Sequence, residues 1–152
     1  MLRSDLPIAL PLHLAIDYDD ALGIDMDQAA GDMGSFIILS KCEVFRAGAL
    51  VTEVCAGSTS TPVVKFDKRP TGGSDTERGD GDIAELKLLT TVAGKVMIDE
   101  VAKGEILYPG EEVVVELATA AVGTPTGHIL PFLLVKDIPE ILDNLTNVVE
   151  TT

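Results

Sequence analysis

The chain has 152 residues, 46% hydrophobic and 24% charged, and its 25 acidic against 11 basic side chains give a formal net charge of −14. This length suits one domain with one core, and the charge repels phosphates and anionic lipid, so we expect no nucleic-acid and no membrane partner. The apolar run Ile129 to Val135 stops far short of the roughly 18 residues that a membrane helix needs.

Residues 1–34 are predicted to form an N-terminal arm followed by an acidic loop. Met1 to Ile16 carries a single basic residue and is broken by two prolines, which is atypical of a signal peptide, so we expect it to stay on the mature protein. An edge strand is predicted over 12–16. Apolar residues lie among these prolines and are candidate contacts with another subunit: Leu6, Ile8, Leu10 and Leu12.

The acidic loop is predicted over 17–34 and contains six aspartates: Asp17, Asp19, Asp20, Asp25, Asp27 and Asp32. Clustered carboxylates can bind calcium, but the EF-hand spacing is not met, because Leu22 stands where glycine is required and Gln28 where a bidentate glutamate belongs. We therefore interpret the segment as a solvated loop and expect no metal site.

Residues 35–137 are predicted to form the body of the domain, and their dominant pattern is the period-two alternation of β-strands. The predicted strands are 36–39, 42–47, 49–54, 63–67, 83–88, 95–101, 112–117 and 128–135. Gly48 is expected at a bulge or tight turn. With glycine and proline between short strands, and no long helical pattern, we predict an antiparallel β-sandwich or barrel. The predicted core contains Val113, Val115, Leu117, Val96, Ile98, Leu86 and Phe66.

Two features interrupt this pattern. Pro131 cannot donate a hydrogen bond to a neighbouring strand, so the run 128–135 is expected at a sheet edge, at a bulge or against another subunit. Residues 68–82 are rich in glycine, proline and charge and are predicted as a long loop. The tripeptide Arg78-Gly79-Asp80 in this loop matches an integrin-binding sequence, but matches of that length are frequent by chance.

Residues 138–152 form a predicted C-terminal arm or short helix. Asp137 is a candidate cap with Glu140 three residues later. Five apolar residues share one face of the predicted helix and are candidate subunit or capsid contacts: Ile138, Ile141, Leu142, Leu145 and Val149. A stripe of this kind must contact either the body of the domain or a neighbouring subunit.

No catalytic constellation is recognisable, and we predict that the protein is not an enzyme and needs no cofactor. His13 and His128 lie outside any nucleophile signature and are expected as strand residues. Cys42 and Cys55 lack the spacing of a zinc site and are interpreted as reduced core residues, although a chain reversal near Gly48 would let them face each other.

From Gly48 onward the order of segments resembles the small jelly-roll capsid decoration (cement) proteins of tailed bacteriophages. The similar pieces are Ala49 to Glu53 followed by Gly57 to Thr61, Gly94 to Val96, Leu107 to Val114, and Ile129 to Val135 followed by an acidic tail. The resemblance covers about two thirds of the chain and consists of strand and turn patterns.

The resemblance implies a jelly-roll-like, all-β protein that binds major capsid protein subunits on the outer capsid surface of a virion, after synthesis in the host cytoplasm. It also implies association with itself as a dimer or trimer. The alternatives are a tail, fibre or connector component of such a particle, a sugar- or receptor-binding module, and a trimeric deoxyuridine triphosphatase. Gly104-Glu105 and Ile98-Asp99 superficially resemble motifs of that enzyme, but its uracil-binding and phosphate-binding signatures are missing.

Overall fold

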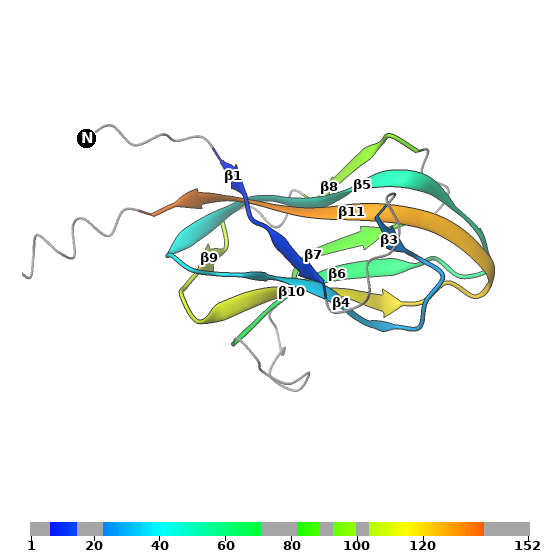
Figure 1. Ribbon diagram of the computed structural model, residues 1–152, viewed down its shortest axis with the longest axis horizontal. Coiled ribbons are helices and arrows are strands. Elements are labelled where there is room, and N and C mark those ends of the chain that lie inside the picture. Colours follow the sequence, from blue (N-terminus) through cyan, green and yellow to red (C-terminus); the bar gives the residue numbers. More distant parts are fainter. Residues whose placement is uncertain (1–6, 15–22, 71–81, 89–92, 100–103, 139–152) are drawn as a thin grey trace, which may run out of the picture.

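A computed structural model describes residues 7–14, 23–70, 82–88, 93–99 and 104–138. These residues are all β, with no helix, and form two antiparallel sheets that lie against each other in a sandwich-like arrangement (Figure 1). The six-stranded sheet contains β1 (Ile8–Ala9), β3 (Ile24–Asp25), β5 (Cys42–Ser58), β8 (Val96–Asp99), β9 (Ile106–Leu107) and β11 (Gly123–Asp137). The five-stranded sheet contains β2 (Leu12–Leu14), β4 (Gly31–Ile37), β6 (Val63–Pro70), β7 (Asp82–Lys87) and β10 (Glu111–Thr119).

The chain passes repeatedly between the two sheets. The six-stranded sheet has the order β1-β11-β5-β8, with β3 also on β11 and β9 also on β5, and the five-stranded sheet has the order β2-β4-β10-β6-β7. Between consecutive strands the chain remains in one sheet only at β6–β7 and β8–β9. Most neighbours within a sheet are therefore distant in sequence, as in the pairs β4–β10 and β5–β11.

The two longest strands, β5 and β11, pair with each other over almost their whole length. Their register runs from Gly123 opposite Ser58 to Asp137 opposite Cys42, with shifts near Thr126, His128 and Leu134. Figure 1 shows both strands curving along the length of the molecule. The inward residues of this pair, among them Val44, Val51 and Leu133, are fully buried against the other sheet.

The core lies between the two sheets and is built from alternate residues of each strand, as the period-two pattern predicts. Phe36 and Phe66 stack at its centre with ring centroids 6.4 Å apart. Five of the seven predicted core residues are buried: Phe66, Leu86, Val113, Val115 and Leu117. The strand predictions around them are confirmed in β6, β7 and β10.

Two predicted core residues are on the wrong face. Val96 and Ile98 are about half exposed, whereas Met97 between them packs against the core. In the register of β8 with β5, Met97 lies opposite buried Ala49 and Ile98 opposite Gly48. Val96, Met97 and Ile98 are all apolar, so the alternation alone does not indicate which face of β8 points inward.

Gly48 is not at a turn, contrary to the expectation from sequence, and β5 continues through it as a strand of 17 residues. A Cβ atom at this position would clash with the carbonyl of Met97 and would lie 2.8 Å from the ring of Phe132. Glycine is therefore required for close approach of the neighbouring chains rather than for a reversal. Because the strand does not turn back, Cys42 and Cys55 lie about 40 Å apart along it, too far for a disulfide.

Both cysteines are buried free thiols, as predicted. Burial is the main cause that raises the pKa of Cys42 to about 11, with smaller contributions from Asp137 and Glu111. Burial also raises the pKa of Cys55, and Glu53 adds to this effect. Both groups therefore stay protonated near neutral pH.

The predicted acidic loop 17–34 is interrupted by structure. Ile24–Asp25 forms β3 and residues 31–34 belong to β4, so the loop prediction is wrong for these positions. Ile24 and Met26 are buried in the core. The sequence did not indicate this, because the aspartates around them made the whole segment look solvent-exposed. Asp17, Asp19 and Asp20 lie outside the described residues.

The predicted loop 68–82 is also shorter than expected. Residues 68–70 belong to β6 and Asp82 belongs to β7. Residues 71–81, which include Arg78-Gly79-Asp80, lie outside the described part of the chain.

Pro131 lies in β11, which pairs with β5 along one side and, among the described residues, with only the short strands β1 and β3 on the other. The carbonyl of Leu133 accepts a hydrogen bond from Leu10 N beside β1, so the backbone groups of Pro131, two residues earlier, face the same side. On that side β3 pairs with His128 and Ile129, and β1 pairs with Leu134 and Val135. Pro131 thus lies between the positions where β3 and β1 pair with β11. Because its nitrogen faces away from β5, the missing N–H removes no hydrogen bond between β11 and β5.

Replacing Val115 by Asp tests the core. Val115 is fully buried in β10, and an unpaired buried carboxylate costs several kcal/mol against a total stability of about 5–15 kcal/mol. We expect the Val115→Asp variant to lose its cooperative thermal transition in circular dichroism. Val122→Asp, at a side chain that is 58% exposed, is the matched control and should melt like the unmodified chain. An unchanged melting temperature for Val115→Asp would refute the core assignment.

The burial of the cysteines predicts how a thiol reagent reacts. With a pKa of about 11 for Cys42, about one thiol in a thousand is ionised at pH 8. We expect Ellman's reagent to titrate no thiol in the native protein within minutes at pH 8 and two thiols in guanidinium chloride. The native rate should rise as pH increases toward 11. Rapid native reaction of either thiol would contradict its placement in the core.

Candidate functional site

The outer face of the six-stranded sheet is strongly apolar. Residues opposite each other in an antiparallel pair point to the same face, and β5 lies between β8 and β11. One row across these strands contains Val96, Leu50 and Leu130, and a second contains Ile98, Gly48 and Phe132. Val96 is 49%, Ile98 48% and Leu130 37% exposed. We call these two rows, together with Leu134, the outer apolar face.

Gly48 leaves room on this face for its neighbours. With no side chain on Gly48, the ring of Phe132 lies over its backbone, and β8 approaches closely on the other side. The six-stranded sheet therefore presents exposed apolar side chains on its outer face, and Val96 and Ile98 also line a cavity of about 620 Å³ between β7 and β8. The prediction from sequence recognised the alternation in this strand but placed Val96 and Ile98 in the core, so it did not identify this surface.

Two cations lie at one end of the outer apolar face. Arg46, opposite Leu134, has its guanidinium carbon 4.6 Å from the centre of the Phe45 ring, and Lys136 has its ammonium nitrogen 4.6 Å from the same centre. Glu43, opposite Lys136, is the acidic residue beside them. Cations over an aromatic ring are held in place by its electron-rich face. Among the described residues, this end of the face therefore has two cations, Arg46 and Lys136, beside one carboxylate, in a chain whose total charge is −14.

The opposite face of the sandwich has a different character. On the five-stranded sheet, Arg69 bonds to Glu112 at 2.7 Å and to Asp32 at 3.2 Å, which links β6, β10 and β4 through one guanidinium group. Lys65 and Glu116 are opposite each other on the same two strands. The two outer faces thus divide into one with paired charges and one that is apolar.

The predicted N-terminal contact residues are held by short strands. Ile8 is in β1 and is 51% exposed, Leu12 is in β2, and both Leu10 and Leu12 pack against the core. Ile8 and Leu10, together with Ile37, Leu39 and other residues, line a small pocket of about 90 Å³. Leu39 beside it is 85% exposed. We call this second apolar surface the N-terminal pocket. Leu6 lies outside the described residues.

Of the predicted C-terminal contacts, Ile138 is described. Its backbone N–H donates to the carbonyl of Lys41 at 3.0 Å. Ile141, Leu142, Leu145 and Val149 lie outside the described residues, as does the rest of the predicted helix or arm, so their contacts stay a prediction.

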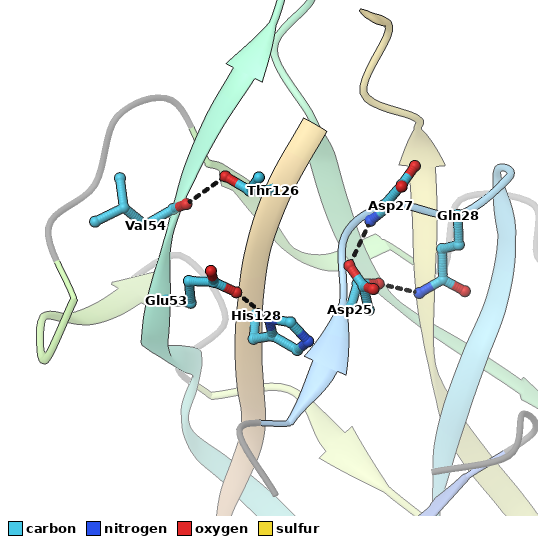
Figure 2. A network of polar contacts seen from close by, with 7 residues as sticks. All are labelled: Asp25, Asp27, Gln28, Glu53, Val54, Thr126 and His128. Atoms are coloured by element: carbon cyan, nitrogen blue, oxygen red, sulfur yellow. Dashed lines mark hydrogen bonds and ion pairs between the residues drawn. The ribbon is translucent and has the colours of Figure 1, made fainter. Parts of the chain in front are cut away.

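A polar cluster lies where β3 joins β11 (Figure 2). His128 is buried, contacts the Glu53 carboxylate through Nδ1, and is opposite Asp25 in the register of β11 with β3. The Asp25 carboxylate accepts a hydrogen bond from Asp27 N at 2.8 Å, and its carbonyl accepts one from the Gln28 amide at 2.5 Å. Glu53 and His128 are 75 residues apart, so no local signature could have revealed the pair.

This cluster has little of what nucleophilic catalysis requires. The nearest candidate nucleophile is Cys55, whose sulfur lies beside Gly127, but burial raises its pKa and reduces its thiolate fraction. Both histidines lie in strands, as expected, His13 in β2 and His128 in β11. In the described part of the chain, no group of three or more His, Cys, Asp and Glu side chains is arranged to hold a metal ion. The His128–Glu53 contact joins β11 to β5, and the Asp25 bonds hold the turn that follows β3.

Glu105 and Asp99, which belong to the segments that resemble motifs of deoxyuridine triphosphatase, both form hydrogen bonds within the domain. Glu105 accepts a 2.6 Å hydrogen bond from Lys68, an interaction that raises the pKa of the Lys68 ammonium. Asp99 accepts a hydrogen bond from the Glu85 backbone N–H at 2.8 Å, which joins β8 to β7 across the edge of the sandwich. Both carboxylates thus take part in contacts between strands.

Comparison with protein-family models, curated proteins and solved structures found no match. Among the described residues, no helix is long and apolar enough to cross a membrane. The surfaces described above are therefore interpreted from their own geometry.

The Arg69 bridge predicts a measurable contribution to stability. Replacing Arg69 by Met leaves the nearly buried Glu112 carboxylate without this partner, and we expect the free energy of unfolding in urea to fall by about 1–3 kcal/mol. Lys87→Met is the control, because Lys87 pairs with Glu85 at the surface, where such pairs contribute about 0–1 kcal/mol. Equal losses for the two variants would refute a special role for Arg69.

Proposed function

We propose that the protein is a non-enzymatic structural protein of a virion, which decorates the outer face of a tailed-phage capsid by binding major capsid protein subunits. The observation that carries this proposal is the presence of two separate apolar surfaces, the outer apolar face and the N-terminal pocket, on a strongly acidic β-sandwich. Exposed apolar surface of this kind is typical of protein contacts. Two such surfaces suit a protein that touches both a scaffold and further copies of itself.

The fold supports the proposal at the level of architecture. The chain alternates between two antiparallel sheets and pairs strands that are distant in sequence, as jelly-roll domains do. The negative charge suits the outside of a shell filled with DNA, because acidic surfaces avoid phosphate. His128 contacts Glu53, and Cys42 and Cys55 are buried in the core, which favours binding over catalysis.

We assign the capsid contact to the N-terminal residues, with Ile8 and Leu10 beside the N-terminal pocket and Leu6 and Leu12 on either side of them. Ile8 is half exposed on a two-residue strand at the edge of its sheet. Such an edge is suited to apolar and main-chain contacts with another protein. A tail, fibre or connector position in the same kind of particle would use the same surface.

Binding to capsids is tested by co-expressing the chain with a major capsid protein from the same genome and measuring retention on purified particles. We expect retention to persist from low salt to about 1 M salt, where the Debye length is about 3 Å, because the contacts are apolar and acidic copies repel less when screened. Ile8→Asp should reduce retention, whereas the exposed Val122→Asp should not. Release by salt alone, or equal retention of the two variants, would contradict the proposal.

A further inference from the structure

The outer apolar face is too small to hold two copies together by itself. Its rows cross three strands about 4.8 Å apart and extend about 14 Å along β11, so it covers roughly 200 Å². A stable interface between two proteins buries roughly 800 Å² on each partner. The face is better suited to a short segment than to a second copy of itself.

The chain contains a segment that complements this face. Residues 139–152 include five apolar side chains, three carboxylates and no basic residue. The carboxylates of Glu140, Asp143 and Glu150 complement Arg46 and Lys136, and the apolar residues complement the two rows. With 14 residues, the segment extends about 21 Å as a helix or about 46 Å as a strand, so either conformation spans the face.

The end of β11 favours docking on a neighbour rather than on the same chain. Ile138 N donates to the carbonyl of Lys41, which continues the β11–β5 ladder beyond Asp137. A residue before proline is held in an extended conformation, and Pro139 follows Ile138. At Ile138, the last described residue, the chain therefore runs in the direction of β11, away from the rows between Leu130 and Leu134. To cover its own face, the segment would have to reverse.

We propose that residues 139–152 of one copy dock on the outer apolar face of a second copy, with their carboxylates beside Arg46 and Lys136. Each copy donates its C-terminal segment and receives another, so each copy takes part in two contacts, and a segment longer than the rows buries area beyond the face itself. The contacts form a dimer or a small ring where the rotation between copies closes. The proposal rests on the assignment of the outer apolar face as a protein-binding surface under the proposed function. It leaves the N-terminal pocket for the capsid.

The test uses the purified full chain without any capsid protein, so it can fail while capsid binding holds. Sedimentation velocity should show an oligomer for the full chain and a monomer for a chain ending at Ile138. A fluorescent peptide of residues 138–152 should bind the shortened chain, and Ile98→Asp or Arg46→Glu in that chain should weaken binding at least about tenfold. Val122→Asp, away from the face, should leave peptide binding unchanged.

Each alternative has its own signature. A monomeric full chain whose shortening exposes dye-binding apolar surface would show docking within one chain and would overturn the proposal. So would a shortened chain that keeps the same oligomeric state, because another surface would then hold the copies together. Circular dichroism melting of each variant shows that it is folded. Peptide binding that is unaffected by Ile98→Asp and Arg46→Glu would place the contact elsewhere.

Discussion

The hydrogen-bonded pair of β5 and β11 is the constraint on which the rest of the structure depends. These two strands position the other four strands of the six-stranded sheet, because β1 and β3 pair with β11 and β8 and β9 pair with β5. Their inward residues supply one wall of the core, and their outward residues supply the outer apolar face. The same ladder thus controls stability and the surface proposed for association. Gly48 connects the two roles, because a larger residue there would displace both Phe132 and β8.

The charge of the molecule is distributed unevenly, and the outer faces of the two sheets therefore differ in character. On the five-stranded sheet, carboxylates are neutralised by Arg69 and its neighbours, so that face is stabilised within the chain. On the six-stranded sheet, Arg46 and Lys136 lie over Phe45 at the end of an apolar surface. A cationic edge beside exposed hydrophobic residues is suited to an acidic amphipathic partner, and the C-terminal sequence of the chain is of that kind.

The sequence was sufficient to predict the all-β class and the inward faces of β6, β7 and β10, because polar and apolar residues alternate there. It failed at β8, where Val96, Met97 and Ile98 are all apolar and only pairing with β5 decides which face is buried. It also failed at Gly48, since a glycine needed for close approach looks the same in sequence as one needed for a turn. The pairs Glu53–His128 and Arg69–Glu112 join distant positions, so one sequence has no local signal for either.

Native-state hydrogen exchange followed by mass spectrometry tests the role of the β5–β11 ladder most directly. Amides in the most protected elements exchange only through global unfolding, and those in short edge strands exchange through local opening. The structure predicts that peptides covering 44–51 and 129–135 exchange last and at a common rate, while those from β1, β3 and β9 exchange earlier. If peptides from β5 and β11 exchanged at different rates, or as fast as β1, the ladder would not be the element on which the fold depends.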